Sequence, residues 1–475
     1  MAQRSEWSRR KFLGASALGV LGLTACGGGP PPAPAVRVEV PGPVLSEAAP
    51  YKGGRVGLLS NKLYSQAAND AVTGSVQAFA EATGTTVENS LISGDTGDAV
   101  AKIDAAIKAG VGRDMVFLPD NRFVAQLYGL GDLTDVSDAV AALTAQLGEP
   151  ASEARSSCVF DGKWFAIPYH FIGIGSFLRK DWMAEKGIAL KETYGWPELR
   201  DICLEISDPA KRRFGWGNTI NRSGDANGFI EAVVNCWGGS IDANDGRRVT
   251  FNSPETVEAV EFIADIYRNP KYKPMLPPGI ESWTDTSNNE NWLAGVIGFT
   301  GNQYSLYADS KATGNPVYPN THPFIGGTGP ASDHALGNLG QSQALVVLKG
   351  AKNPELAKVL AKYLVSGTPL LNVAKQAPGL AMPAWAKVWD ADPFYTQGDP
   401  AFPQQRKIAQ QPLPVTTSTG YTFPATPSAG RQATLQAYVL TDMMQQVLRG
   451  TSAKDAVAAA HGRIVQIFEQ QGIKQ

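Results

Sequence analysis

Polar side chains follow two predicted strands, at the point where each strand ends. Asn61, Lys62 and Tyr64 come after the apolar run 55–59, and a second set follows the run 115–117. Amide, carboxylate and cationic groups at such turns can hydrogen-bond to the hydroxyl edges of a small polar molecule. In open α/β sheets, ligands bind beyond the carboxyl ends of strands. We therefore predict that both sets contribute to one binding site; the second consists of Asp120, Asn121 and Arg122.

These polar residues also have structural interpretations. Asn61 and Asn121 could instead cap turns, and Arg122 could form an ion pair with a neighbouring carboxylate. Aromatic side chains would complete a binding site because a ring offers a flat apolar face to a sugar. The residues alone suggest three aromatic candidates, although core packing is as good an explanation for the two tryptophans: Trp237 beside a glycine pair, Trp283, and Tyr421.

The chain lacks the motifs that mark common catalytic and cofactor sites. It contains no GxGxxG after the first strand, no phosphate-binding loop and no HExxH. His322 and His334 could meet in space, but solvated loop histidines are the better explanation. The segment 242–246 is better explained as a tight turn than as a calcium loop. We expect no catalytic residue, no cofactor, no metal site and no enzyme activity. A pair of acidic residues for glycoside hydrolysis is the alternative left open, because such a pair is defined by its distance in the folded protein and not by its spacing in the sequence.

The first fifty residues are typical of an exported protein. Arg9 and Arg10 precede an apolar run that is too short to span a membrane, which resembles a twin-arginine export signal over residues 1–25. The run ends in Leu-Thr-Ala-Cys26, which looks like a bacterial lipobox and predicts a lipidated cysteine. The Pro- and Gly-rich residues 26–50 predict a tether, so the folded part should begin near Tyr51. We therefore expect the protein outside the cytoplasm, lipid-anchored at the membrane.

Composition limits the class of binding partner and indicates the number of domains. The chain has 42 basic and 44 acidic residues, for a formal charge of −2. Removing the signal would lower this charge to about −5, with no basic block, so nucleic acid is an unexpected partner. The roughly 425 residues after the tether exceed one ordinary core and predict two domains. Cys158, Cys203 and Cys236 could form at most one internal disulfide.

Strand and helix patterns alternate from residue 54 onward. Strands are predicted at 55–59, 85–92 and 115–117, and helices between them start near Asn69 and Asp98. This alternation favours an α/β fold with a mainly parallel sheet. Further predicted helices begin at Pro254 and Pro354, and two more close the chain; the stretch 400–427 is predicted to be ordered loop. The closing helices are predicted at 432–449 and 452–471.

The chain resembles the family-1 extracellular solute-binding proteins, the group that includes maltodextrin-binding proteins. The most specific segment is 161–169, Asp-Gly-Lys-Trp-Phe-Ala-Ile-Pro-Tyr, which is similar to the first crossover between two lobes of that family. The order of the other similar segments extends over some four hundred residues: 79–87, 113–117, 179–182 with 187–188, 196–199, 237–239, 292–295, 352–355 and 450–456.

The resemblance implies a two-lobed periplasmic-binding-protein fold, with a hinge and a ligand cleft between the lobes. Lobe 1 would be 51–165, joined again by about 300–345, and lobe 2 would be 166–299 with about 346–475. It also implies a monomer that closes on a carbohydrate and delivers it to the membrane subunits of an ABC permease. Alternatives are a binding protein for a polyol or a glycerophosphodiester, a twin-arginine-exported enzyme, and a receptor or scaffold that no longer transports.

Site residues also follow from the resemblance. Asn121-Arg122 aligns with an Asp-Arg pair of the maltodextrin group, and Asn61, Lys62 and Tyr64 are similar to its polar contacts. The segment 299–304 stands where relatives have a Gly-Pro-Trp stacking element. The remaining tryptophans (Trp182, Trp196, Trp292, Trp385 and Trp389) are predicted to be core or hinge. Further candidate ligand-binding residues lie in the crossover, in the segment 214–218 and in the segment 299–304. They are Tyr169, His170, Trp216, Asn218, Asn302, Gln303 and Tyr304.

Overall fold

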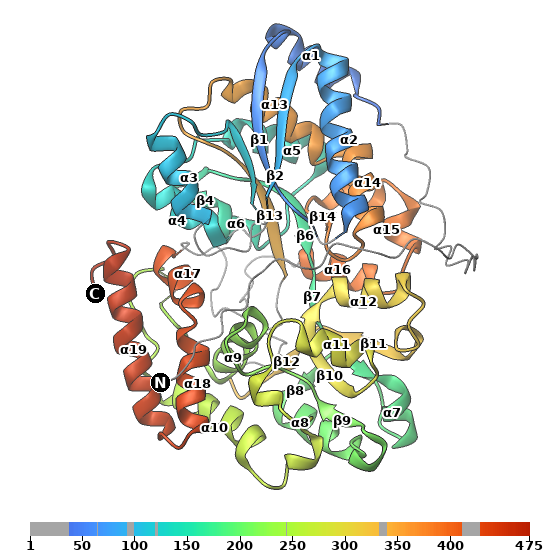
Figure 1. The fold of residues 1–475 in the computed structure, drawn as a ribbon, viewed down its shortest axis with the longest axis vertical. Helices are drawn as coiled ribbons and strands as arrows, with labels where there is room; N and C mark the ends of the chain where they lie inside the picture. The colour runs from blue at the N-terminus through green and yellow to red at the C-terminus, as the bar shows by residue number, and fades with distance from the viewer. Residues whose placement is uncertain are drawn as a thin grey trace, which may run out of the picture. The chain divides into compact units, whose positions relative to one another are not determined.

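The chain divides into two units, residues 1–37 and residues 38–475. The computed structural model describes residues 38–63, 65–92, 99–118, 122–243, 245–331, 340–410 and 428–475. The predicted export signal and the predicted lipidation of Cys26 therefore lie outside the described residues. The second unit contains two larger β-sheets (Figure 1). We call the six-stranded sheet with the helices packed on it lobe 1, and the four-stranded sheet with its helices lobe 2.

The sheet of lobe 1 has the order β14-β6-β13-β3-β1-β2. Strands β1, β2 and β3 are parallel, and β13 is antiparallel to both β3 and β6. Every residue of β3 is buried, as expected for a central strand covered on both faces. The strand bounds are β1 Arg55–Asn61, β2 Thr86–Ile92, β3 Met115–Leu118, β6 Ile167–Ile172, β13 Gln341–Val347 and β14 Met382–Pro383.

The helices of lobe 1 follow the predicted alternation. Helix α2 begins one residue after Ser65, whose side chain accepts a hydrogen bond from the Ala68 N–H, and it ends at Gly84 in the left-handed conformation. Its buried face includes Val72, Val76 and Phe79, as predicted. The helices are α1 Gly42–Ala48, α2 Gln66–Thr83, α3 Ala99–Lys108, α4 Arg122–Leu130, α5 Ser137–Leu147, α6 Ala154–Cys158, α13 Pro354–Leu364 and α14 Gly367–Gln376.

The sheet of lobe 2 has the order β11-β7-β10-β9. Strand β10 is parallel to β9 and antiparallel to β7, which is antiparallel to β11. Two small sheets pair β12 with β8 and β4 with β5. The bounds are β7 Ile174–Arg179, β9 Phe214–Trp216, β10 Ile297–Gln303, β11 Thr321–Phe324, β8 Tyr194–Gly195, β12 Gly327–Thr328, β4 Val159–Phe160 and β5 Lys163–Trp164.

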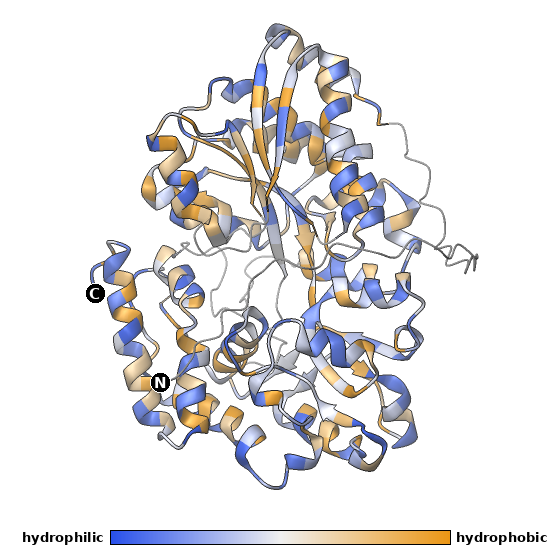
Figure 2. Ribbon diagram, in the orientation of Figure 1, coloured by the Kyte–Doolittle hydropathy of each residue, from blue (hydrophilic) through white to orange (hydrophobic). Residues whose placement is uncertain are grey.

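The helices that cover lobe 2 include the last three of the chain, of which α17 also packs against α4 of lobe 1 and is joined to it by a 3.0 Å hydrogen bond from Gln126 to Gln436. In Figure 2, α18 and α19 alternate hydrophobic and hydrophilic residues along their length, as expected of helices with one buried face. The bounds are α7 Lys180–Glu185, α8 Trp196–Glu205, α9 Gly224–Trp237, α10 Pro254–Arg268, α11 Ser287–Leu293, α12 Tyr304–Ala312, α17 Ala429–Gln436, α18 Val439–Leu448 and α19 Ala453–Gln470. Two helices, α15 Pro393–Gln397 and α16 Phe402–Ala409, lie between β14 and α17 in the chain.

Strand pairing differs from the predicted division of the chain. The segment near 300–345 was expected to return to lobe 1, but β10, β11 and β12 all pair within lobe 2. The return to lobe 1 is made by β13, which begins inside the segment that was assigned to lobe 1, and by α13, α14 and β14, which lie in the part of the chain that was assigned to lobe 2. Strand β6 also pairs in lobe 1, so the first crossover comes at Gly173 and not at 165. Apolar periodicity identifies a strand but carries no information about which sheet it joins.

Two predicted elements near the C-terminus differ from the structure. The single helix expected over 432–449 is two helices, α17 and α18, because Tyr438 between them is left-handed with φ 57°. The predicted loop 400–427 contains α16, and residues 411–427 lie outside the described part of the chain. Cys158, Cys203 and Cys236 are buried and free, so none of the three forms the disulfide that was left open.

The folded unit begins earlier than the predicted boundary at Tyr51. Helix α1 packs against α13 and α2, Ala48 is fully buried, and Val44 lies against the core. Glu47 of α1 also forms an ion pair with Lys362 of α13. Residues 38–50 therefore belong to lobe 1 and not to the tether. Their prolines had suggested a linker, yet Pro43 lies in the first turn of α1, where a missing N–H costs no hydrogen bond.

A protein shortened to residues 51–475 should be less stable than one of residues 38–475. Loss of the apolar contacts of α1 should lower the free energy of unfolding by about 2–4 kcal/mol, measured by urea denaturation. Glu47→Gln in the longer protein should lower it by less than about 1 kcal/mol, because an exposed ion pair contributes little. Equal stability of the two lengths would show that α1 does not contribute to the core.

Candidate functional site

The carboxyl ends of the lobe 1 strands point toward the crossover into lobe 2. Strand β13 is antiparallel to both β3 and β6, so β6 runs in the same direction as β1 and β3. Strand β6 ends at Ile172, and the chain passes through Gly173 directly into β7 of lobe 2. The turns that follow β1 and β3 therefore lie at the edge of the sheet that faces this crossover.

The carboxyl ends of the lobe 2 strands meet the same crossover. Strands β9 and β10 are parallel, and β10 ends at Gln303. The next residue, Tyr304, donates a main-chain hydrogen bond of 3.0 Å to the carbonyl oxygen of Gly173. Polar residues that follow β1 and β9, and those that end β10, are thus gathered at one junction between the two sheets. We call this region the lobe junction.

At the end of β1 the structure describes part of the first predicted set. Asn61 is buried, and its Nδ2 donates to the Lys62 carbonyl oxygen at 3.1 Å, while its Oδ1 has no partner among the described residues. Lys62 is exposed, and Asn69 holds the turn by bonding both the N–H and the carbonyl of Leu63. A buried acceptor without a partner is costly unless a ligand or water satisfies it. Asn61 therefore bonds within its own turn through Nδ2 and keeps one acceptor oxygen that a ligand could satisfy.

Several predicted residues cannot be placed. Tyr64, Asp120, Asn121 and Tyr421 lie outside the described residues, and Arg122 is described only as the first residue of α4. His334 also lies outside the described residues, so its proposed meeting with His322 has no structural test. His322 itself stacks on Phe324, and its Nε2 lies 2.7 Å from the Lys191 carbonyl oxygen.

At the ends of β9 and β10, Asn218 and Asn302 each form hydrogen bonds that tie neighbouring segments of lobe 2 together. Asn218 Oδ1 accepts a hydrogen bond from the Gly301 N–H at 2.7 Å, which ties the loop after β9 to β10. Asn302 Nδ2 donates to Asn289 Oδ1 and lies 3.4 Å from Asp225 Oδ2. Gln303, partly exposed, is the last residue of β10. These three predicted residues lie together at the lobe junction.

Sequence reasoning missed the acidic residues of the lobe junction. Asp225, in the first turn of α9, accepts a 2.8 Å hydrogen bond from Asn288 Nδ2 of α11. Asp285 accepts hydrogen bonds from the Gly224 and Asp225 N–H groups at 3.1 and 2.9 Å. Burial of the carboxyl group, and secondarily the like charge of Asp285, raises the pKa of Asp225 to about 7. The Ser223 cap before Gly224-Asp225 was the available signal, since it marks a helix start soon after a strand end.

Most of the predicted aromatic contacts belong to the core. Trp216 is fully buried between Phe229 and Phe299, and its indole N–H donates to the Tyr267 hydroxyl. Tyr169 and His170 are fully buried and stack on one another. These rings were predicted at the site, but in this structure they present no face to a ligand. Apolar side chains at a strand end can be core or platform, and the sequence does not separate the two.

The remaining aromatic candidates lie in other settings. Trp237 packs its ring against Phe262 of α10, with centroids 4.7 Å apart, and Trp283 is buried after a short 3-10 helix. Tyr304 is fully buried at the crossover, and its ring meets Phe177 edge to face. The tryptophans predicted to be core (Trp182, Trp196, Trp292, Trp385 and Trp389) are all buried.

Burial also decides the protonation of His170. Enclosure in the sheet lowers the pKa of His170 to about 3, so the ring is neutral at any physiological pH. Its Nδ1 lies 3.2 Å from Gln343 Oε1, and Phe117 meets the ring edge to face. In the described part of the chain, no group of three or more His, Cys, Asp or Glu side chains has the arrangement of a metal site.

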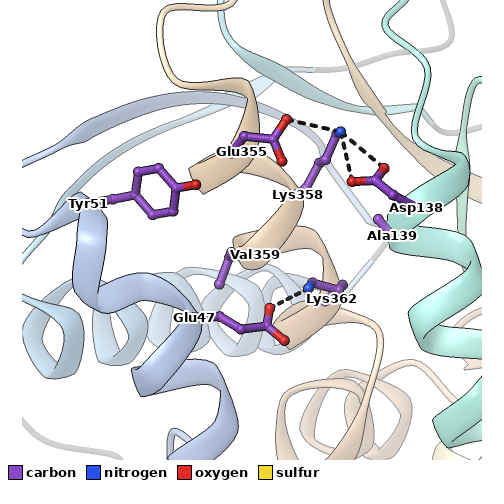
Figure 3. A pocket seen from close by; sticks show the side chains of 8 residues that line it. All are labelled: Glu47, Tyr51, Asp138, Ala139, Glu355, Lys358, Val359 and Lys362. Atoms are coloured by element: carbon purple, nitrogen blue, oxygen red, sulfur yellow. Dashed lines mark hydrogen bonds and ion pairs between the residues drawn. The ribbon is translucent and has the colours of Figure 1, made fainter.

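A cavity of about 260 Å³ lies elsewhere in lobe 1, between α1, α5 and α13 (Figure 3). Its two lysines are held in ion pairs, Lys358 with Asp138 and Glu355, and Lys362 with Glu47. Tyr51, which lines the cavity, precedes β1, so the cavity lies near the amino end of that strand. It is therefore separate from the lobe junction, and its ion pairs join α13 to α5 and to α1.

A model of the bacterial extracellular solute-binding protein family matches residues 74–404. The chain belongs to this family. The sequence resemblance is thus confirmed, and with it the prediction of an ABC-transporter solute-binding protein. No curated protein sequence matches the chain. Among the described residues, no helix of this solute-binding protein has the length and apolar character needed to cross a bilayer.

Solved structures share the fold of this solute-binding protein at low identity. An ABC transporter solute-binding protein of Thermotoga lettingae, bound to α-D-tagatose, has 18% identity and a TM-score of 0.68, covering 87% of this chain and 99% of its own. Maltose-bound MalE3 of T. maritima has the same identity and score, covering 86% and 98%. A protein of Agrobacterium vitis with D-mannitol also has 18% identity and a TM-score of 0.68, covering 89% and 100%. These matches confirm the predicted α/β binding-protein fold.

The packing of Tyr304 at the crossover predicts the effect of one glycine substitution. A Cβ on Gly175 would lie 2.6 Å from the buried Tyr304 ring, so Gly175→Ala should lower the free energy of unfolding by about 1–3 kcal/mol. Gly228→Ala is the control, because α9 leaves open space at that position and alanine should raise the stability by up to about 1 kcal/mol. Urea denaturation of both variants measures the difference. A neutral Gly175→Ala would show that Tyr304 does not pack tightly on the crossover.

Proposed function

We propose that this solute-binding protein captures a carbohydrate or polyol outside the cytoplasm and delivers it to an ABC permease. The observation that carries the proposal is the set of hydrogen-bonding groups at the lobe junction, Asn61 from lobe 1 and Asn218, Asn302 and Asp225 from lobe 2. Amide and carboxylate groups of this kind match the donors and acceptors of a hydroxyl-rich molecule. Tagatose, maltose and mannitol in the similar structures support this ligand class.

The charge on the lobe 2 side of the junction disfavours the glycerophosphodiester alternative, for which the exposed Lys62 on the lobe 1 side would be the available cation. Asp225 and Asp285 lie together on the lobe 2 side, and neither forms an ion pair with a lysine or arginine of the described residues. Arg222, which is three residues from Asp225, is held by Asp442 through two 2.7 Å hydrogen bonds. A phosphate group would be repelled by two acids that lack a cation. A neutral polyol is the alternative that a specific observation favours, because D-mannitol and ribitol occupy two of the similar proteins.

The proposed mechanism is closure of the two lobes on the solute. Groups from the two lobes can bond one ligand together only when the lobes are close, so ligand would shift the population toward a closed form that the permease recognises. The proposal includes a monomer anchored through lipid on Cys26, with no chemical step and therefore no enzyme activity. The boundaries of the moving bodies would follow the two sheets.

A thermal-shift panel tests the ligand class. The melting temperature of residues 38–475 should rise with concentration of maltose, D-tagatose, D-mannitol or ribitol, because a ligand that binds only the folded form stabilises it, by about 2.7 kcal/mol at a hundredfold excess over Kd. Chromatography of the mixture should show no product. A rise with glycerophosphocholine alone would contradict the carbohydrate assignment, and turnover of any sugar would contradict the assignment as a binding protein.

A further inference from the structure

The carboxylate of Asp225 is held in a fixed position by two other elements of lobe 2. Asn288 of α11, which is fully buried, donates to its Oδ2 at 2.8 Å, and Asn302 of β10 lies 3.4 Å from the same oxygen. No hydrogen bond of the described residues reaches its Oδ1. The side chain is only partly buried, so one oxygen is clamped and the other remains accessible at the lobe junction.

The surroundings of Asp225 supply no positive charge. The N-terminal N–H groups of α9, which normally favour an anion, are taken by Asp285. Asp285 is the charged group that acts on Asp225, and it acts by repulsion. Arg222 is committed to Asp442 on α18, and the contacts from α11 and β10 are neutral amides.

This arrangement costs stability, which is unusual for a residue that serves only the fold. A structural carboxylate is normally paired with a cation or placed in water, whereas Asp225 is partly enclosed beside a second acid. Its negative form is therefore opposed by the folded protein and would be favoured by a bound hydrogen-bond donor. Groups held in such an unfavourable state are typical of binding and catalytic sites.

We propose that Asp225 is a specificity-determining residue, whose accessible oxygen accepts a hydrogen bond from a ligand hydroxyl or ammonium group and whose charge excludes anionic ligands. The inference rests on the proposed function and adds which ligands the site accepts and which it rejects. It predicts that neutral polyols, sugars and amino sugars are accepted and that phosphorylated or carboxylated analogues are rejected. Because the pKa of Asp225 is raised to about 7, ligand affinity should fall as the pH is lowered from 8 to 5.5.

A measurement without ligand tests the state of Asp225 by itself. The folded pKa lies above the unfolded value, so the contribution of this group to stability is full below the unfolded pKa and is lost as the pH rises through about 7. Asparagine does not ionise, so Asp225→Asn removes that loss. The difference in melting temperature between the variant and the parent (variant minus parent) should therefore be larger at pH 8 than at pH 5. A purely structural carboxylate would instead make the variant less stable at both values.

Binding is then compared across matched variants by calorimetry at pH 8. The probes are maltose, D-tagatose, D-mannitol, D-glucosamine, glycerophosphocholine and D-glucose 6-phosphate. Asp225→Asn should weaken binding of whichever neutral or cationic probe the parent binds by about tenfold or more, and should abolish its pH dependence. Glu258→Gln is the control, since Glu258 is an exposed acid of α10 outside the lobe junction; it should leave affinity unchanged.

The outcomes separate this inference from the proposed function. Equal affinity and an equal pH profile in the parent and Asp225→Asn would overturn the role of Asp225 while leaving carbohydrate binding intact. Tight binding of D-glucose 6-phosphate by the parent would overturn the selection rule. If the parent binds none of the probes, the proposed carbohydrate function and the ligand role of Asp225 both fail.

Discussion

The hydrogen bond from the Tyr304 N–H to the Gly173 carbonyl is the contact on which the arrangement of the site depends. Gly173 is the residue through which the chain first leaves lobe 1, and Tyr304 directly follows β10 of lobe 2. This hydrogen bond brings the carboxyl ends of β1 and β3 in lobe 1 and of β9 and β10 in lobe 2 to one junction. The buried Tyr304 ring packs against Gly175 and Phe177, so the crossover that joins the two lobes beside these strand ends is tightly packed.

The junction groups are costly to the folded protein in ways that a ligand would relieve. Asn61 keeps a buried oxygen without a partner in the described structure, and Asp225 is partly enclosed beside Asp285. Trp216, by contrast, is fully buried and paired, because it packs against Phe229 and Phe299 and its indole N–H donates to the Tyr267 hydroxyl. Neutral hydroxyl groups would match the acceptor oxygens of Asn61 and Asp225, whereas anions would not.

The sequence was sufficient for the fold class and for much of the first half, because strand-helix alternation and capping residues are local signals. It predicted the start of α10 at Pro254 and the end of α2 at Gly84, although α2 begins at Gln66 and not near Asn69. It could not decide which sheet β10 and β13 join, since pairing depends on contacts distant in the chain. It missed α1, whose prolines resemble a linker, and the break at Tyr438 between α17 and α18. Asp225 was missed because its partners, Asn288 and Asp285, are about sixty residues away.

Closure of the lobes on a solute is the central claim, and a distance between the lobes tests it most directly. Val111 of lobe 1 and Leu190 of lobe 2 are 74% and 47% exposed, and the cysteines of residues 38–475 (Cys158, Cys203 and Cys236) are buried. Spin labels on Val111→Cys and Leu190→Cys would therefore report on the two lobes, and labels on Val111→Cys and Leu130→Cys would report within lobe 1 alone. We predict that a bound sugar or polyol shifts the first distance and leaves the second unchanged. An unchanged distance between the lobes with ligand bound would contradict closure.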